Sequence, residues 1–67
     1  MRDPNRIYGY CNRLMAIWSK VPDWRFGQLM MNLLGEFSGQ TGKDPFFPED
    51  EELFAFFEQF FREQKQS

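Results

Sequence analysis

The chain has 67 residues, of which 42% are hydrophobic, and its formal net charge at pH 7 is −2. A chain of this length forms one domain at most and buries only about 60% of the surface that its unfolded form exposes. Nine Phe, two Trp and two Tyr supply large apolar side chains for so small a core, which argues against a disordered chain and favours a folded domain.

Composition also limits the chemistry that the chain can perform. It contains no His, so the commonest general base and metal ligand is missing. The single Cys, Cys11, has no partner for an intramolecular disulfide, and no apolar run is long enough to span a membrane. We therefore expect a cytoplasmic protein that is not an enzyme, with no catalytic residues, no cofactor and no metal site.

A first helix is predicted from about residue 4 to residue 20. Asp3 suits the N-cap, and Pro4 suits the first helical position, where a missing N–H costs nothing. Apolar residues recur along this segment at spacings of three and four: Ile7, Cys11, Leu14, Trp18 and Val21. Other apolar residues widen this stripe to about 180°, namely Tyr10 and Ile17 on one flank and Tyr8 and Met15 on the other. Because Cys11 lies inside the stripe, it is expected to be a buried thiol.

The second predicted helix, residues 23–37, is the one around which the chain is organised. Pro22 disfavours helical dihedrals at the residue before it, so the first helix should end there, with Asp23 as the N-cap of the second. The short connection predicts an antiparallel hairpin or a steeply crossed pair. The apolar side chains of the second helix fall within one arc of about 140°: Phe26, Leu29, Met30, Leu33, Leu34 and Phe37.

The opposite side of the second helix carries three polar residues that packing does not require, Arg25, Gln28 and Asn32. They form a candidate binding face. Alternatively they serve the fold itself, with Arg25 pairing with one of three carboxylates: Asp23, Asp44 or Asp50.

The rest of the chain is predicted to be a flexible loop over residues 38–43, a stiff segment over residues 44–48 and a third helix over residues 49–64. Two prolines stiffen the middle segment, and Phe46 and Phe47 between them are so apolar that at least one is expected to fill the core. Acidic residues at the start of the third helix suit its dipole. Its apolar arc of about 160° contains Leu53, Phe54, Phe56, Phe57, Phe60 and Phe61.

The predicted fold class is all-α, a single small three-helix domain over residues 1–67 with an aromatic core. The predicted core residues are Ile7, Leu14, Trp18, Phe26, Leu29, Met30, Leu33, Phe57 and Phe60. The apolar arcs of the first and third helices are wider than a three-helix monomer needs, which predicts a homodimer. The residues expected at its interface lie at the edges of the arcs: Tyr8, Tyr10, Ile17, Met31, Phe54 and Phe61.

Several short stretches together resemble a known group of proteins: Arg2-Asp3-Pro4, Arg6-Ile7, Ile17-Trp18, Pro22-Asp23, Arg25, Gly27-Gln28-Leu29, Asn32, Asp44-Pro45-Phe46, Glu49-Asp50 and Leu53. On these residues the chain resembles a family of short bacterial and prophage-borne proteins of unknown function. More distantly, its Trp–Pro–Asp–Gln–Leu skeleton is similar to the uncharacterised YihD family. The resemblance covers nearly the whole chain and implies a small helical fold. By analogy, a prophage-like origin fits a regulatory or anti-defence role.

Two kinds of macromolecular partner remain open. Residues 1–25 carry five Lys/Arg against two Asp, a charge of +3, whereas residues 26–67 carry three Lys/Arg against eight Asp/Glu, a charge of −5. A basic stripe on the first helix is a candidate for contacting the phosphates of DNA or RNA: Arg2, Arg6, Arg13 and Lys20. Because the chain as a whole is acidic, a small protein–protein interaction module is the preferred interpretation and a nucleic-acid-binding regulator is the alternative.

Overall fold

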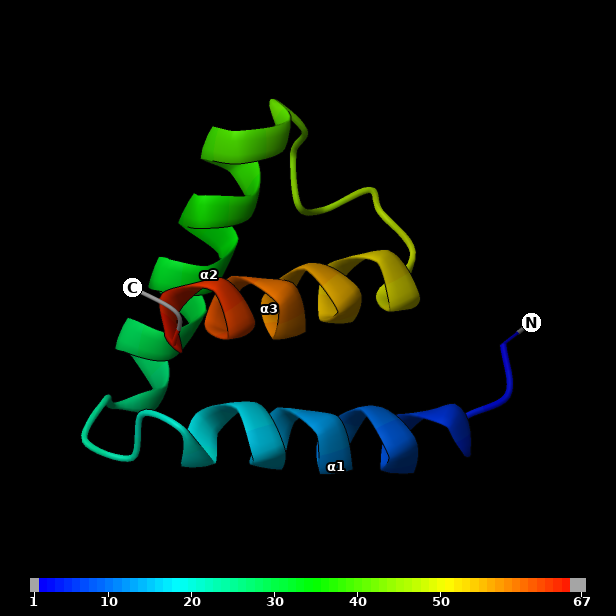
Figure 1. Ribbon diagram of the computed structural model, residues 1–67. Helices are drawn as coiled ribbons and strands as arrows, with labels where there is room; N and C mark the ends of the chain where they lie inside the picture. Colours follow the sequence, from blue (N-terminus) through cyan, green and yellow to red (C-terminus); the bar gives the residue numbers. More distant parts are fainter. Residues whose placement is uncertain (1, 66–67) are drawn as a thin grey trace.

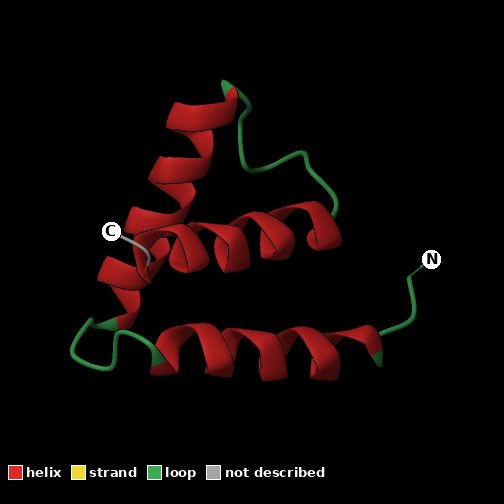
Figure 2. Cartoon of the chain, in the orientation of Figure 1, coloured by secondary structure: helices red, strands yellow, loops and turns green. Residues whose placement is uncertain are grey.

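The computed structural model describes residues 2–65 and the side chains of residues 2–62, and this part of the chain folds into three helices, α1 (Arg6–Ser19), α2 (Phe26–Thr41) and α3 (Asp50–Lys65) (Figures 1 and 2). α1 and α3 run side by side in the same direction, and α2 crosses them steeply (Figure 1). α3 packs against both other helices. The predicted all-α, three-helix fold class is confirmed.

α1 begins after a tight turn that is built on Asp3. The Oδ1 of Asp3 accepts a hydrogen bond from the N–H of Asn5 at 2.9 Å, and its carbonyl accepts one from the N–H of Arg6 at 3.2 Å. Asp3 therefore stabilises the turn before the helix, but the N-cap position of α1 is taken by Asn5, so the prediction that Asp3 is the N-cap is wrong. The regular helix begins at Arg6, two residues later than predicted, because Pro4 and Asn5 belong to this turn.

The connection between α1 and α2 is held by the indole of Trp18, whose Nε1–H donates to the carbonyl of Trp24 at 2.8 Å. This turn delays α2 until Phe26, so the prediction that Asp23 is its N-cap is wrong. Arg25 occupies the N-cap position in an extended conformation, and its N–H donates to the Oε1 of Gln28 at 2.8 Å. Gln28 thus reaches back to the cap residue, as the third residue of a capping box does.

The end of α2 also differs from the prediction. Residues 38–41 are helical, so the expected flexible loop over residues 38–43 is wrong for most of its length. The hydroxyl of Thr41 donates to the carbonyl of Phe37 at 2.7 Å. Gly42, with φ 73°, then ends the helix, and its N–H donates to the carbonyl of Ser38 at 2.9 Å. A left-handed glycine is a common helix end, which places the stop signal at Gly42.

Two glycine substitutions test this helix end. Gly42→Ala is expected to lower the free energy of unfolding by about 1 kcal/mol, because a residue with a Cβ is strained in the left-handed region. Gly39 lies inside α2, and a Cβ added there meets nothing within 4 Å. Gly39→Ala should therefore raise the free energy of unfolding by about 0.5–1 kcal/mol. Urea unfolding measures both; shifts of the same sign would place the helix end elsewhere.

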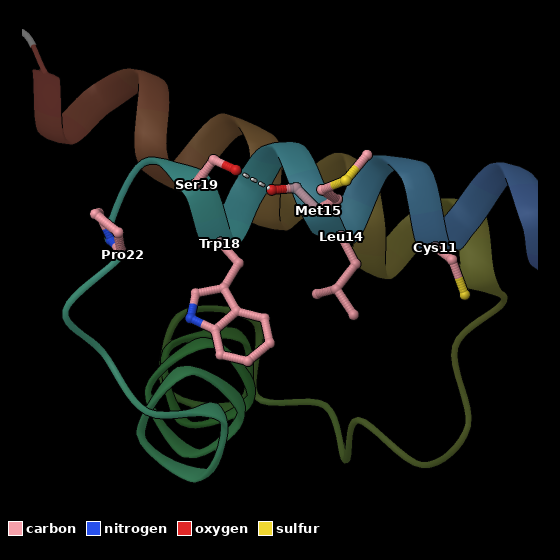
Figure 3. Close-up of a pocket in the computed structure, with 6 residues that line it drawn as sticks. All are labelled: Cys11, Leu14, Met15, Trp18, Ser19 and Pro22. Carbon is pink, nitrogen blue, oxygen red and sulfur yellow. Dashed lines mark hydrogen bonds between the residues drawn. The ribbon is translucent and has the colours of Figure 1, made fainter.

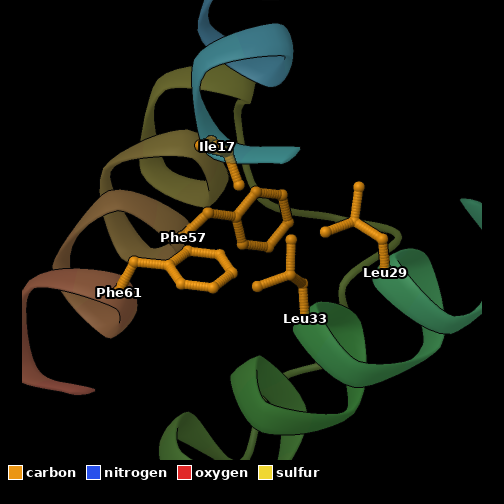
Figure 4. Close-up of a cluster of buried hydrophobic side chains, with 5 residues drawn as sticks. All are labelled: Ile17, Leu29, Leu33, Phe57 and Phe61. Carbon is orange, nitrogen blue, oxygen red and sulfur yellow. The ribbon is translucent and has the colours of Figure 1, made fainter. Parts of the chain in front are cut away.

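The core lies where the three helices meet. Its main cluster takes Ile17 from α1, Leu29 and Leu33 from α2, and Phe57 and Phe61 from α3 (Figure 4). Phe37 is also buried, and its ring packs edge to face with that of Phe56, with the two ring centroids 5.3 Å apart. The hydrophobic residues packed half-buried around the cluster are Leu14, Trp18, Val21, Trp24, Met30, Leu34, Leu53, Phe54, Phe56 and Phe60.

The predicted core is therefore correct on α2 and α3 and partly wrong at α1 and at the start of α2. Leu29, Leu33 and Phe57 are buried as predicted, and four further predicted core residues are half-buried against them: Leu14, Trp18, Met30 and Phe60. Ile7 and Phe26 were expected in the core, but they are 50% and 51% exposed.

Two residues assigned to a dimer interface lie in the core instead. Ile17 is 1% exposed and Phe61 is 5% exposed, so neither side chain is available to a partner. The physical reason is that α1 turns the flank carrying Tyr10 and Ile17 toward α3, away from the central line of its apolar stripe.

Candidate functional site

Ion pairs join the facing sides of α1 and α3. The guanidinium of Arg2 lies 2.8 Å from the Oε1 of Glu49, and the Nε of Arg6 lies 3.0 Å from the Oδ2 of Asp50. Because the two helices run in the same direction, the basic start of α1 meets the acidic start of α3. The charge asymmetry of the sequence is thus largely neutralised within the fold.

Arg13 is the centre of this contact. Its Nη1 lies 2.7 Å from the Oε1 of Glu51, and its Nε and Nη2 each lie 2.9 Å from an oxygen of Glu58. The guanidinium also covers the rings of Tyr10 and Phe54, at 5.4 and 5.5 Å from their centroids. Hydrogen bonds from Arg13 lower the pKa of both Glu51 and Glu58, and the same bonds raise the pKa of Arg13.

These contacts occupy most of the predicted basic stripe. Arg2, Arg6 and Arg13 are paired with carboxylates of the same chain, and the positive charge of Lys20 helps to lower the pKa of Glu58. A nucleic-acid phosphate would have to compete with these carboxylates for the three arginines. The pairing therefore weakens the case for nucleic acid.

The same contact accounts for two more of the predicted interface residues. Tyr10 and Phe54 are half-buried, and their ring centroids lie 4.9 Å apart between α1 and α3. Of the predicted set, only Tyr8 and Met31 are largely exposed, at 73% and 76%. Most of the exposed apolar surface of the chain therefore lies at residues outside the predicted interface set.

The other flank of α1 is open. A groove of about 410 Å³, here called the α1 groove, is lined by Cys11, Leu14, Met15, Trp18, Ser19 and Pro22 (Figure 3). Cys11, Leu14 and Trp18 project from the same side of α1 (Figure 3). The hydroxyl of Ser19 donates to the carbonyl of Met15 at 2.7 Å, so the groove presents mostly apolar surface.

Apolar side chains extend the α1 groove at both ends. A smaller hollow of about 170 Å³ shares Cys11 and Leu14 with it and extends to Ile7 and to the ion pair of Arg6 and Asp50 between α1 and α3. At the other end the ring of Phe26, half exposed, lies 5.5 Å from that of Trp18. The groove follows the middle and C-terminal turns of α1, and α2 leaves that end of α1 at a steep angle (Figure 1).

Cys11 lies in this open groove and is exposed, so the prediction of a buried thiol is wrong. The cause is the same rotation of α1 toward α3 that buries Ile17. The chain's one thiol is therefore accessible to a probe that reports on the groove.

A second exposed apolar feature is the loop of residues 44–48, here called the aromatic loop. Phe46 is 83% exposed and Phe47 is 76% exposed, so the prediction that one of them fills the core is wrong. Asp44 closes the loop: its Oδ1 accepts from the N–H of Phe46 at 2.9 Å and its carbonyl accepts from that of Phe47 at 3.3 Å. The two rings pack edge to face, with centroids 5.1 Å apart.

The polar face predicted on the second helix is exposed at all three positions, Arg25, Gln28 and Asn32. Arg25 and Gln28 also serve the fold at the start of α2, where the N–H of the N-cap residue Arg25 donates to the side chain of Gln28. Among the described residues, the guanidinium of Arg25 forms no ion pair, so the alternative in which it fastens Asp23, Asp44 or Asp50 is not realised.

Two further observations concern the described residues. No three acidic or Cys side chains there lie close enough together to hold a metal ion. No helix in residues 2–65 has the length and apolar character needed to cross a membrane.

Comparisons of the chain with protein-family models, curated proteins and solved structures find no match. The two exposed apolar features of the fold, the α1 groove and the aromatic loop, are therefore the candidate functional surfaces.

Proposed function

We propose that this protein is a non-enzymatic helical module that acts by binding another protein chain in the α1 groove. The observation that carries the proposal is the open apolar flank of α1. Met15 is 63% exposed there, and Ile7 and Phe26 at the two ends are about half exposed. A folded chain rarely leaves connected apolar surface of this kind in water unless a partner covers it.

The chemistry of the groove suits a protein partner. Aromatic residues and Met are enriched in the centres of protein interfaces, and the groove and its rim supply Trp18, Phe26 and Met15. From Ile7, in the adjoining hollow, to Ser19 at the end of α1, the apolar surface follows about three turns of the helix, roughly 18 Å at 1.5 Å per residue. That length accommodates an extended or helical segment of a partner.

A nucleic-acid partner is less well supported, because the arginines that would bind phosphate face carboxylates of α3. Because the groove is lined mainly by apolar side chains, it is suited to binding a partner's surface, as a regulator or inhibitor does. This extension to a regulatory or anti-defence role rests on analogy with small phage-borne proteins.

Cys11 provides the experiment. A small diazirine probe attached to Cys11 and irradiated in producing cells is expected to crosslink a discrete protein, because the thiol lies in the groove. The matched control carries the probe at Met31→Cys in a Cys11→Ser background. Met31 is 76% exposed on α2, outside the groove, and should give no discrete adduct.

A third sample links the adduct to the groove itself. Met15→Glu places a charge in the groove and should strongly reduce crosslinking from Cys11. Equal adducts from positions 11 and 31, or adducts with nucleic acid alone, would contradict the proposed function.

A further inference from the structure

We infer that the α1 groove receives the aromatic loop of a second copy of this chain, so that two copies exchange Phe46 and Phe47 about a two-fold axis. The inference rests on the proposed function, because it names the partner of the same groove. It is carried by the match between an exposed aromatic pair and an open apolar groove that share one small domain.

The aromatic loop has the properties of a preformed insert. Phe46 is the most exposed large hydrophobic residue described, and its ring packs against that of Phe47 to form one compact unit. Asp44 holds the backbone of both, and Pro45 and Pro48 fix their own φ angles. Such a loop loses little conformational freedom when it binds.

The α1 groove has room for this unit. An apolar cavity of about 150 Å³ accepts one benzene molecule, and two phenyl rings therefore need roughly 300 Å³. The volume of the groove is about 410 Å³, and its lining is mainly apolar. Trp18 and Met15 offer an aromatic face and a thioether to the entering rings, and both kinds of contact are favourable.

Charge favours the same pairing. Around the loop, Glu49 pairs with Arg2 and Lys43 pairs with Glu52, which leaves Asp44 without an ion pair among the described residues. At the Pro22 end of the groove, Lys20 and Arg25 outnumber Asp23 and are exposed. The anionic side of the loop therefore meets a cationic end of the groove.

The buried area decides in favour of a reciprocal exchange. A fully buried aromatic side chain covers about 150–250 Å², so the exposed parts of Phe46 and Phe47 together supply roughly 300 Å². One such contact falls well short of the total of about 1,200 Å² that a specific interface buries, and a second, symmetry-related contact doubles the area. Two contacts related by a two-fold axis also close the assembly.

The first test is sedimentation equilibrium of the full chain at concentrations between about 1 and 100 μM, because a small interface is expected to be weak. The 8.1 kDa chain should show a reversible dimer. The double variant Phe46→Ser/Phe47→Ser should weaken the dimer at least tenfold, and so should Met15→Glu. Met31→Ser, an exposed site outside both features, should leave it unchanged, and circular dichroism should show all variants folded.

The second test locates the contact. With the diazirine probe on Cys11 of the purified chain, covalent dimers should form, and mass spectrometry should map the adduct to residues 44–48 of the second copy. A monomer throughout the concentration range, a dimer insensitive to the loop variant, or adducts that map to α1 would overturn the inference. A monomer in solution that still crosslinks another protein in cells would overturn it while leaving the proposed function standing.

Discussion

Phe57→Ala is expected to remove most of the stability of this domain, about 3–5 kcal/mol. Phe57 is 4% exposed and packs with Ile17, Leu29 and Leu33 in the cluster that joins the three helices (Figure 4). Truncation leaves a cavity that none of the three helices can close alone. At 0.05–0.15 kcal/mol per residue, the whole chain has only about 3–10 kcal/mol of stability, so the variant should be largely unfolded near room temperature.

The chain supplies a matched control for this change. Phe47→Ala removes the same atoms from a side chain that is 76% exposed, and the free energy of unfolding should change by no more than about 0.5 kcal/mol. Urea unfolding followed by circular dichroism, at a concentration low enough to keep the chain monomeric, compares the two. Similar unfolding midpoints for the two variants would show that the core is not where the structure places it.

Arg13→Gln should lower the stability of the fold more than any other change to a partly exposed side chain, and this loss of stability should depend on pH. The hydrogen bonds from Arg13 lower the pKa of Glu51 and Glu58 in the folded state. A carboxylate with a lowered pKa stabilises the fold above its unfolded pKa of about 4.5, and this contribution is lost as the pH falls through the lower folded value. The wild-type chain should therefore lose stability as the pH falls below about 4.5.

Thermal melts from pH 7 down to pH 3 check this expectation. Arg13→Gln should melt lower than the wild type at neutral pH, and its melting temperature should fall less steeply in acid. Arg25→Gln is the control, because Arg25 is exposed and forms no ion pair in the described part of the chain. Parallel curves for Arg13→Gln and the wild type would mean that Arg13 does not hold the two carboxylates.

The helices themselves were predictable because their signals are local. The acidic start of α3 and its run of Phe and Leu at helical spacing predict its position within one residue at each end. The errors at the ends of α2 come from competing local signals. Asp23 is a good capping residue by type, but the hydrogen bond from Trp18 to Trp24 fixes the turn and moves the cap to Arg25.

The rotation of α1 could not be predicted from its own sequence. Its apolar arc is wide enough to be buried along more than one line, and the choice is made by residues far along the chain. Glu51 and Glu58 hold Arg13 and so turn the Tyr10 flank inward. That rotation buries Ile17 and exposes Cys11.

The candidate site was missed for related reasons. The rule that places Phe in the core describes average burial, and it fails at Phe46 and Phe47 because Asp44 closes their loop outside the helices. Met15 lies on one flank of the predicted stripe, and the sequence alone does not show which flank stays open. The excess of apolar surface could be read from the sequence, but its location depends on the steep departure of α2 from α1 (Figure 1).

The central claim is that the α1 groove is the surface through which this chain binds protein. Photo-crosslinking from position 11, compared with position 31, tests it most directly, because both sites are exposed and only position 11 lies in the groove. We expect one discrete protein adduct from Cys11 that Met15→Glu suppresses, and none from Met31→Cys. Adducts of equal yield from the two positions, unaffected by Met15→Glu, would contradict the claim.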